Sequence, residues 1–258
     1  MRDRLRWLPV AAVLLTAASP AAAQDFRWSG SLPQGKTIEI RGINGSVTAE
    51  PSGGTTIEVT AEKRERRDDP NSVRIEVVQS ESGVTICAVY PEREGARPNE
   101  CAPGGGRMNT QNSDVQVNFT VRVPSGVALS GNTVNGDVEA ERLKSDLELH
   151  TVNGSITFST TGHAEASTVN GSIRGEIGRA DWSDSLTLKT VNGSVTLTLP
   201  SSVNADFTAS TVNGDIDTDF PLTVSGRISR HRPEGTIGAG GRGLSIRTVN
   251  GGITLKRG

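Results

Sequence analysis

The tetrapeptide Thr-Val-Asn-Gly occurs six times in this chain, and this repeat restricts the possible folds more than any other feature. A seventh, degenerate copy is Ile43-Asn44-Gly45. Each Gly is followed by Asp, Ser or Gly and then by Val or Ile. The first five Asn residues are spaced 18, 17, 22 and 21 residues apart, and a gap of 37 leads to Asn250. Periods near 20 residues predict a solenoid or an array of hairpins.

Each copy of the repeat has the pattern of a strand, a corner and a second strand. Around Asn192-Gly193, apolar and polar residues alternate over 186–190 and again over 195–199, as in half-buried strands. Asn-Gly tolerates the positive φ values of a tight turn. We therefore expect structural roles for the corner residues Asn135, Gly136, Asn153, Gly154, Asn170, Gly171, Asn192, Gly193, Asn213, Gly214, Asn250 and Gly251.

Two all-β architectures satisfy this pattern. In an antiparallel β-meander each copy is a hairpin, and in a β-solenoid each copy is one coil stacked on the next about 4.8 Å away. Hairpins explain the Asn-Gly turn alone. Stacking also explains the Thr and Val that precede it, because like residues then form ladders in which Asn amides and Thr hydroxyls bond along the stack. We favour the β-solenoid, with hairpin insertions.

Residues 1–23 have the pattern of a signal peptide. A basic start with three Arg precedes an apolar stretch over 8–18, which is too short to span a bilayer, and small residues follow at 21–23. Their removal leaves 24 basic and 28 acidic residues, a formal charge of −4, which argues against nucleic-acid binding. No later segment holds 18 apolar residues. We expect an exported, soluble protein of the periplasm or the cell exterior, without a membrane span.

The rest of the chain divides into two continuous regions. Residues 24–130 form an N-terminal β region in which alternating strands are separated by longer loops, and residues 131–258 form the repeat solenoid. The extra residues between Asn213 and Asn250 predict an inserted loop or hairpin. Cys87 and Cys101 are an even pair in an exported chain, which predicts a disulfide contributing roughly 3 kcal/mol. Two unlinked thiols are the alternative, since Cys87 on a strand can point away from the loop.

The sequence shows no catalytic constellation. The histidines His150, His163 and His231 are not at metal-ligand spacing from Cys or Glu, and none stands beside a nucleophile in a recognisable elbow. His150 occupies the repeat position that holds Lys189 and Arg247 in other copies, which favours an exposed strand residue. We expect neither an enzyme nor a cofactor.

Two charged groups are candidates for binding. Asp215, Asp217 and Asp219 alternate along one strand, so their three carboxylates project from one face and are a candidate Ca²⁺ site. A solvated face is the alternative. The second group is a cluster of positive charge on an expected loop. These residues are candidates for contact with phosphate or an acidic polysaccharide. The members of the cluster are Arg227, Arg230, His231 and Arg232.

The repeated Thr-Val-Asn-Gly-(Ser/Asp)-Ile corners behind a signal peptide, with the early copy Ile43-Asn44-Gly45-Ser46-Val47, resemble the bacterial putative-adhesin family of β-strand repeat domains of unknown function. The resemblance covers roughly residues 36–258. It implies a β-helix-like solenoid on an exported or envelope-associated protein. It supplies no catalytic residues.

Three classes of function are compatible with these observations. The first is a non-catalytic envelope or cell-surface protein with an adhesin-like binding or scaffold role, whose partner is a glycan or a protein. The second is a polysaccharide-active β-helix enzyme, which would need clustered Asp, Lys, Arg or Tyr, whereas Tyr90 is the single tyrosine. The third is a structural component of the periplasmic stress response.

Overall fold

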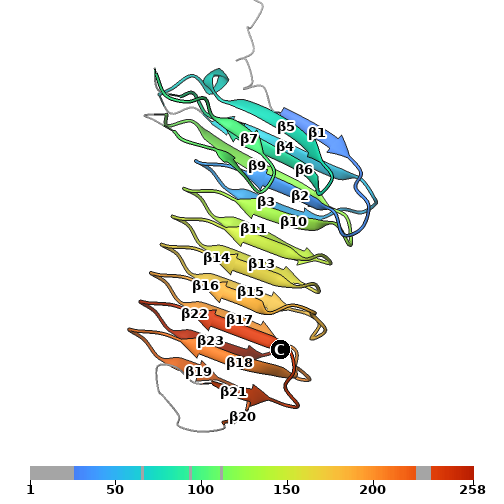
Figure 1. The fold of residues 1–258 in the computed structure, drawn as a ribbon, viewed down its shortest axis with the longest axis vertical. Coiled ribbons are helices and arrows are strands. Elements are labelled where there is room, and N and C mark those ends of the chain that lie inside the picture. The colour runs from blue at the N-terminus through green and yellow to red at the C-terminus, as the bar shows by residue number, and fades with distance from the viewer. Residues whose placement is uncertain (1–25, 65–66, 93–94, 111–112, 225–233) are drawn as a thin grey trace, which may run out of the picture.

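A computed structural model describes residues 26–64, 67–92, 95–110, 113–224 and 234–258, and these residues form a β-solenoid (Figure 1). Within these ranges the one helical element is the 3-10 turn η1 (Pro70–Ser72). No helix of the described chain is both long and apolar enough to cross a membrane. The expected signal peptide, residues 1–23, lies outside the described residues.

Sheet A, one of the two long sheets, contains ten strands of the described chain in the order β1-β4-β9-β3-β11-β13-β15-β17-β23-β19. The strands are β1 (Phe26–Gly30), β4 (Ile57–Arg64), β9 (Gln116–Val123), β3 (Val47–Pro51), β11 (Val138–Leu143), β13 (Ile156–Thr160), β15 (Ile173–Ile177), β17 (Val195–Leu199), β23 (Ile253–Arg257) and β19 (Ile216–Thr218).

Sheet B contains eleven described strands in the order β20-β21-β18-β22-β16-β14-β12-β10-β2-β6-β5. They are β20 (Leu222–Thr223), β21 (Glu234–Ile237), β18 (Ala205–Ser210), β22 (Gly243–Arg247), β16 (Leu186–Lys189), β14 (Ala164–Ser167), β12 (Leu147–His150), β10 (Ala128–Asn132), β2 (Thr37–Arg41), β6 (Gly83–Val89) and β5 (Arg74–Ser80). A separate antiparallel pair joins β7 (Glu100–Ala102) to β8 (Gly105–Arg107).

The strands of successive repeat copies pair in parallel, one coil on the next. In sheet A, Ile156 pairs with Ile173, which pairs with Val195, and in sheet B the strands β12, β14 and β16 are likewise parallel. This pairing confirms the β-solenoid. The meander is wrong, because hairpins would make neighbouring strands antiparallel.

Inward-facing side chains of both sheets fill one core between them. Leu188 before the corner and Val195 after it have no exposed surface, and Phe158 and Phe207 are among the largest buried side chains. At the N-terminal end, antiparallel strands close the stack: β4 lies on β9, β1 on β4, and β5 on β6. Antiparallel capping pairs the sheet edges that the parallel coils would otherwise leave open.

The coils do not stack in chain order at the C-terminal end. The last coil, β22 and β23, lies between the coil of β16–β17 and the coil of β18–β19, so red strands separate orange ones in Figure 1. The excursion that permits this includes the hairpin β20–β21, as the long gap in the repeat predicted. The inward-facing residues of the inserted strand are the better buried ones: Ile253 and Leu255 are fully buried, whereas Ile216 on the terminal strand β19 is partly exposed.

The corner glycines require space rather than positive φ. Only Gly45 and Gly251 among them have φ in the left-handed range, at 124° and 154°. A Cβ at Gly171, however, would lie 1.9 Å from the carbonyl oxygen of Gly154 in the neighbouring coil, and the same conflict, at 1.9–2.2 Å, recurs at the other corners. The turn chemistry that we expected is therefore the lesser reason for Gly. Close approach of the coils is the main one.

The corner threonines are buried and join the coils. The Thr168 hydroxyl donates to the carbonyl oxygen of Gly154 at 2.8 Å. In the same way the Thr190 hydroxyl donates to the carbonyl oxygen of Gly171 at 2.8 Å. The same bond is present at the other four Thr-Val-Asn-Gly corners. Each Thr therefore satisfies its buried hydroxyl with a bond along the stack, as the ladder interpretation expected.

Candidate functional site

The Asn side chains form a continuous amide ladder along one edge of the solenoid. Each Asn Nδ2 donates to the Oδ1 of the preceding Asn in the stack, at 2.7–2.9 Å. The ladder runs through Asn44, Asn135, Asn153, Asn170, Asn192, Asn250 and Asn213. From Asn135 onward these residues are exposed, so the ladder lies on the surface and not in the core.

The corner valines also lie on the surface, beside the amide ladder. Val134, Val152, Val169, Val191 and Val249 are 36–39% exposed, and Val212 at the end of the stack is 63% exposed. Burial in the core therefore does not account for a valine at this position in every corner. We call these six residues the valine row.

A row of polar side chains runs parallel to the valine row on the outer face of sheet B. Its members precede the corner Thr, or Gly42 in the first copy, and they align in register across adjacent strands. In stacking order they are Arg41, Asn132, His150, Ser167, Lys189, Arg247 and Ser210. We call these seven residues the basic row, because four of them are Arg, Lys or His and none carries a carboxylate. Its regularity follows from the repeat.

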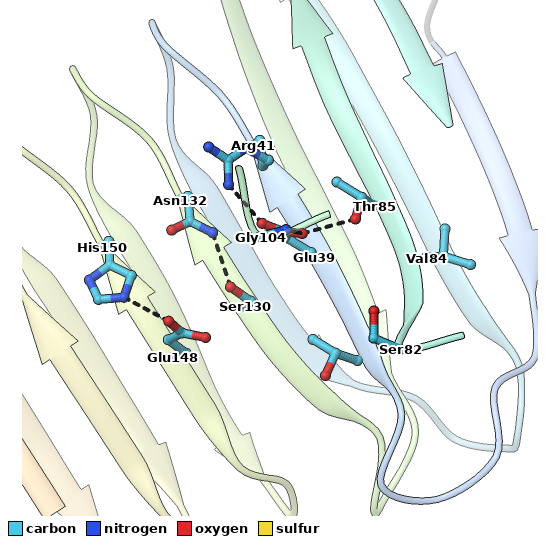
Figure 2. A pocket seen from close by; sticks show the side chains of 11 residues that line it. Glu39, Arg41, Ser82, Val84, Thr85, Gly104, Ser130, Asn132, Glu148 and His150 are labelled. Carbon is cyan, nitrogen blue, oxygen red and sulfur yellow. Dashed lines mark hydrogen bonds and ion pairs between the residues drawn. The ribbon is translucent and has the colours of Figure 1, made fainter. Parts of the chain in front are cut away.

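The next row on the same face carries the carboxylates. On three strands the residue two positions earlier bonds to the basic row: Glu39 accepts from Arg41 at 2.8 Å, Ser130 accepts from Asn132 at 3.0 Å, and Glu148 lies 3.2 Å from His150. Figure 2 shows these three pairs side by side on β2, β10 and β12. Residues i and i+2 of a strand share a face, so the two rows form one surface.

A cleft of about 350 Å³ lies over these pairs, at the side of the β7–β8 hairpin (Figure 2). Glu39 is buried in it, and its Oε2 accepts from the Thr85 hydroxyl and from the backbone N–H of Gly104, both at 2.9 Å. The Nε of Arg41 is buried without a hydrogen-bond partner among the described residues. This atom has almost no exposed surface, so it lies behind the surface of the cleft and is not one of its binding groups.

A disulfide and hydrogen bonds fix the segment that contains the β7–β8 hairpin beside the cleft. Cys87 on β6 and Cys101 on β7 form the expected disulfide, with their Cα atoms 5.8 Å apart. The Tyr90 hydroxyl donates toward the carbonyl oxygens of Asn44 and Val115, at 3.1 and 3.0 Å. Burial raises the pKa of Tyr90 to about 12, an effect that the contact with the Asn44 backbone partly offsets. The hairpin is thereby fixed to the first coil.

His150 also contacts a hydroxyl that the sequence did not place beside it. Its Nδ1 lies 2.7 Å from the Ser167 Oγ on the neighbouring strand, and its Nε2 faces Glu148. The order Ser-His-Glu resembles a hydrolase triad. Ser167, however, lies in the middle of a parallel sheet, where the backbone N–H groups pair with neighbouring strands and cannot form an oxyanion hole.

The acidic residues Asp215, Asp217 and Asp219 lie on and beside β19, the terminal strand of sheet A. Within the described ranges no group of three His, Cys, Asp or Glu side chains is placed to hold a metal, and this includes Asp215, Asp217 and Asp219. The Oδ2 of Asp219 instead accepts from the Arg257 backbone N–H at 3.2 Å. A Ca²⁺ site at these three residues stays a prediction.

The basic loop residues Arg227, Arg230 and Arg232 lie outside the described residues. The cleft residues Glu39, Arg41, Asn132 and His150 were missed by sequence reasoning as a group. The available signal was the shared position of His150, Lys189 and Arg247 in the repeat, which places them in one row once the stacking is known.

Three of the solved structures that match this chain come from bacteria. A putative cell adhesion protein from Clostridium sporogenes matches with a TM-score of 0.52 and 10% identity, over 91% of this chain and 100% of that one. Putative adhesins from Bacteroides fragilis (TM-score 0.23, 8% identity, 91% and 97% covered) and Parabacteroides merdae (TM-score 0.25, 12% identity, 90% and 95% covered) also match. The first supports the solenoid fold, and the other two are too distant in geometry to support an argument.

No curated protein matches the chain. The family model described as Toastrack DUF4097 matches residues 99–256, which is more than half of the sequence and includes all six Thr-Val-Asn-Gly corners. This match agrees with the resemblance to bacterial β-strand repeat domains of unknown function that the corner motif indicated. The chain belongs to the Toastrack DUF4097 family.

Proposed function

We propose that this protein is a non-catalytic, exported component of the bacterial envelope or cell surface, and that it binds a partner through the outer face of sheet B. The cleft beside the β7–β8 hairpin is the main support. It offers a guanidinium, an amide, an imidazole and hydroxyl groups in fixed positions. A disulfide-fixed rim around convergent polar groups is typical of a preformed binding site.

Export is supported by the signal-peptide pattern of residues 1–23 and by the Cys87–Cys101 disulfide, since disulfides persist in oxidising compartments. The name of the Clostridium sporogenes structure, a putative cell adhesion protein, agrees with a role at the cell surface. A role in adhesion remains part of this proposal.

Absence of catalysis is part of the same proposal. The His150–Ser167 contact is the arrangement most like an active site, but the paired backbone around Ser167 provides no oxyanion donors. A fluorophosphonate probe, which labels activated serines, should leave Ser167 unmodified. Labelling that is lost in a Ser167→Ala variant would instead indicate a hydrolase.

Binding is tested with the chain from Gln24 onward, applied to a glycan array and to immobilised envelope fractions. We expect saturable binding that is weakened at least tenfold by the double change Asn132→Ala and His150→Ala in the cleft. Arg174→Ala, on the exposed face of sheet A, is the control and should bind like the unaltered protein. No saturable binding to any glycan or envelope fraction would contradict the proposed role.

A further inference from the structure

The C-terminal half of the basic row places two like charges side by side. Lys189 on β16 and Arg247 on β22 are paired in register, so about 4.8 Å separates their strands. Both are exposed, and neither makes an ion pair within the described chain. Like charges directly opposite each other destabilise a sheet. An anion bound between them would remove this repulsion.

Uncharged hydrogen-bonding groups flank the two cations. Ser167 precedes Lys189 in the row, and Ser210 follows Arg247. The neighbouring row at this end carries hydroxyls on Thr187, Ser245 and Thr208, whereas at the other end it carries Glu148 and Glu165. Beside the two cations on β16 and β22 the neighbouring row therefore holds hydroxyls, and the outward-facing carboxylates lie further along the sheet, at Glu165 on β14, Asp206 on β18 and Glu234 on β21.

The valine row supplies an apolar strip along the same line. Val191 and Val249 follow Lys189 and Arg247 by two positions, and both are 38% exposed. Near the cleft the equivalent residues Arg41, His150, Val134 and Val152 line one shallow hollow, so the two rows are in contact. Because the Asn ladder pairs its own amides, covering this edge leaves few polar groups unsatisfied.

We propose that this surface binds a linear acidic polysaccharide that lies along the solenoid axis. The basic–valine surface consists of Ser167, Lys189, Arg247 and Ser210 with Val191 and Val249. Carboxylate or sulfate groups of the polymer would contact the two cations, its hydroxyls would bond to the serines, and the apolar C–H faces of its sugar rings would cover the valines. The inference rests on the proposed binding role and specifies the class of partner.

A straight row of repeated side chains suits a linear polymer better than a peptide. Extended peptides are usually bound by addition to a sheet edge, where main-chain groups are free. The row crosses β16 and β22 in the interior of sheet B, so their main-chain groups are already paired.

The test measures binding of the chain from Gln24 onward to polygalacturonate by affinity electrophoresis, with dextran as the uncharged polymer. We expect binding to polygalacturonate alone, weakened by salt, and about tenfold weaker in the variant Lys189→Gln/Arg247→Gln, since each exposed ion pair contributes modestly. Arg174→Gln/Lys256→Gln on sheet A removes the same charge and should change binding less than twofold. Val191→Ser/Val249→Ser should weaken it several-fold.

Equal losses in both double charge variants would show that net charge, and not this surface, controls binding. No binding to polygalacturonate, or stronger binding to poly-glutamate or to anionic lipid vesicles, would overturn the assignment to a polysaccharide. If the protein failed to bind polygalacturonate but still bound envelope fractions, the polysaccharide assignment would be rejected and the proposed function would stand. Loss of both would reject the two proposals together.

Discussion

The side-chain Nδ2 of Asn192 donates to the Oδ1 of Asn170 at 2.8 Å, although the two residues are 22 positions apart in the chain. Asn192 in turn accepts from Asn250 at 2.8 Å, after a separation of 58 residues. All ladder bonds have the same direction, with the donor on the side nearer Asn213. Each inner Asn therefore makes two interactions that depend on correct stacking of three coils.

Replacing Asn192 by Ala should destabilise the fold by about 1 kcal/mol, because two amide hydrogen bonds are lost at an exposed position where water replaces part of their energy. Urea unfolding measures the change. Asn213→Ala, at the end of the ladder, removes only one such bond and should cost about half as much. An equal cost at both positions would mean that the turn, and not the ladder, is the source of the effect.

Gly171→Ala should be more damaging than the loss of any ladder amide. Its Cβ would lie 1.9 Å from the carbonyl oxygen of Gly154, so neighbouring coils must separate, at a cost of about 3 kcal/mol. Gly53→Ala is the matched control, since a Cβ there has nothing within 4 Å. The difference in urea midpoint between the two variants measures the effect. Similar midpoints would show that the coils are not in close contact.

Stability should fall between about pH 10 and pH 12 because of Tyr90. Burial raises its pKa from 10.0 to about 12, so the folded protein keeps the phenol proton after the unfolded chain has lost it. This contribution is complete below pH 10 and is lost as the pH rises through the folded value; it amounts to about 2 to 3 kcal/mol. Unfolding of the native protein and of Tyr90→Phe, measured across this range, gives the comparison. Between pH 10 and pH 12 the free energy of unfolding of Tyr90→Phe should fall distinctly less than that of the native protein. Parallel pH profiles of the two proteins would contradict the assignment of this loss to Tyr90.

Removal of the disulfide by Cys87→Ala and Cys101→Ala should cost about 3 kcal/mol, the entropy of the loop that it closes. It should also release the β7–β8 hairpin, so that the Gly104 amide, which donates to Glu39, exchanges its hydrogen faster. Glu39→Gln keeps the disulfide and should accelerate exchange at Gly104 with a smaller loss of stability. Unchanged exchange in the double alanine variant would show that the disulfide does not hold the hairpin.

Much of the fold follows from local pattern. Alternation places Leu188 and Val195 in the core, and repetition of Thr190-Val191-Asn192 predicts ladders, because identical residues at fixed spacing stack when coils are parallel. The cleft could not be predicted, since Glu39, Thr85 and Gly104 meet only through long-range pairing and the disulfide.

The stacking order of the last two coils could not be predicted from the sequence either. Asn213 and Asn250 lie in almost identical corner motifs, so the coil of either one could stack on the coil of Asn192. Only side-chain packing at the C-terminal end of the solenoid selects between the two orders.

Disulfide trapping decides the order of the coils directly. In the structure Thr196 pairs with Thr254, and Asp217 pairs with Thr254 on its other side. Adjacent strands place the Cα atoms of paired residues about 5 Å apart, whereas Thr196 and Asp217 are two strand spacings, about 10 Å, from each other. A disulfide requires Cα atoms within about 7 Å.

The variant Thr196→Cys/Thr254→Cys should therefore cross-link within the monomer, and Thr196→Cys/Asp217→Cys should not. Both pairs lie on the outer face of sheet A, at the far end of the stack from Cys87, so peptide mapping by mass spectrometry distinguishes the new bond from the native one. If the coils stacked in chain order, Thr196 would pair with Asp217 and the two results would be exchanged. That exchange would return the last coil to the end of the solenoid, and Lys189 and Arg247 would no longer be neighbours in the proposed polysaccharide site.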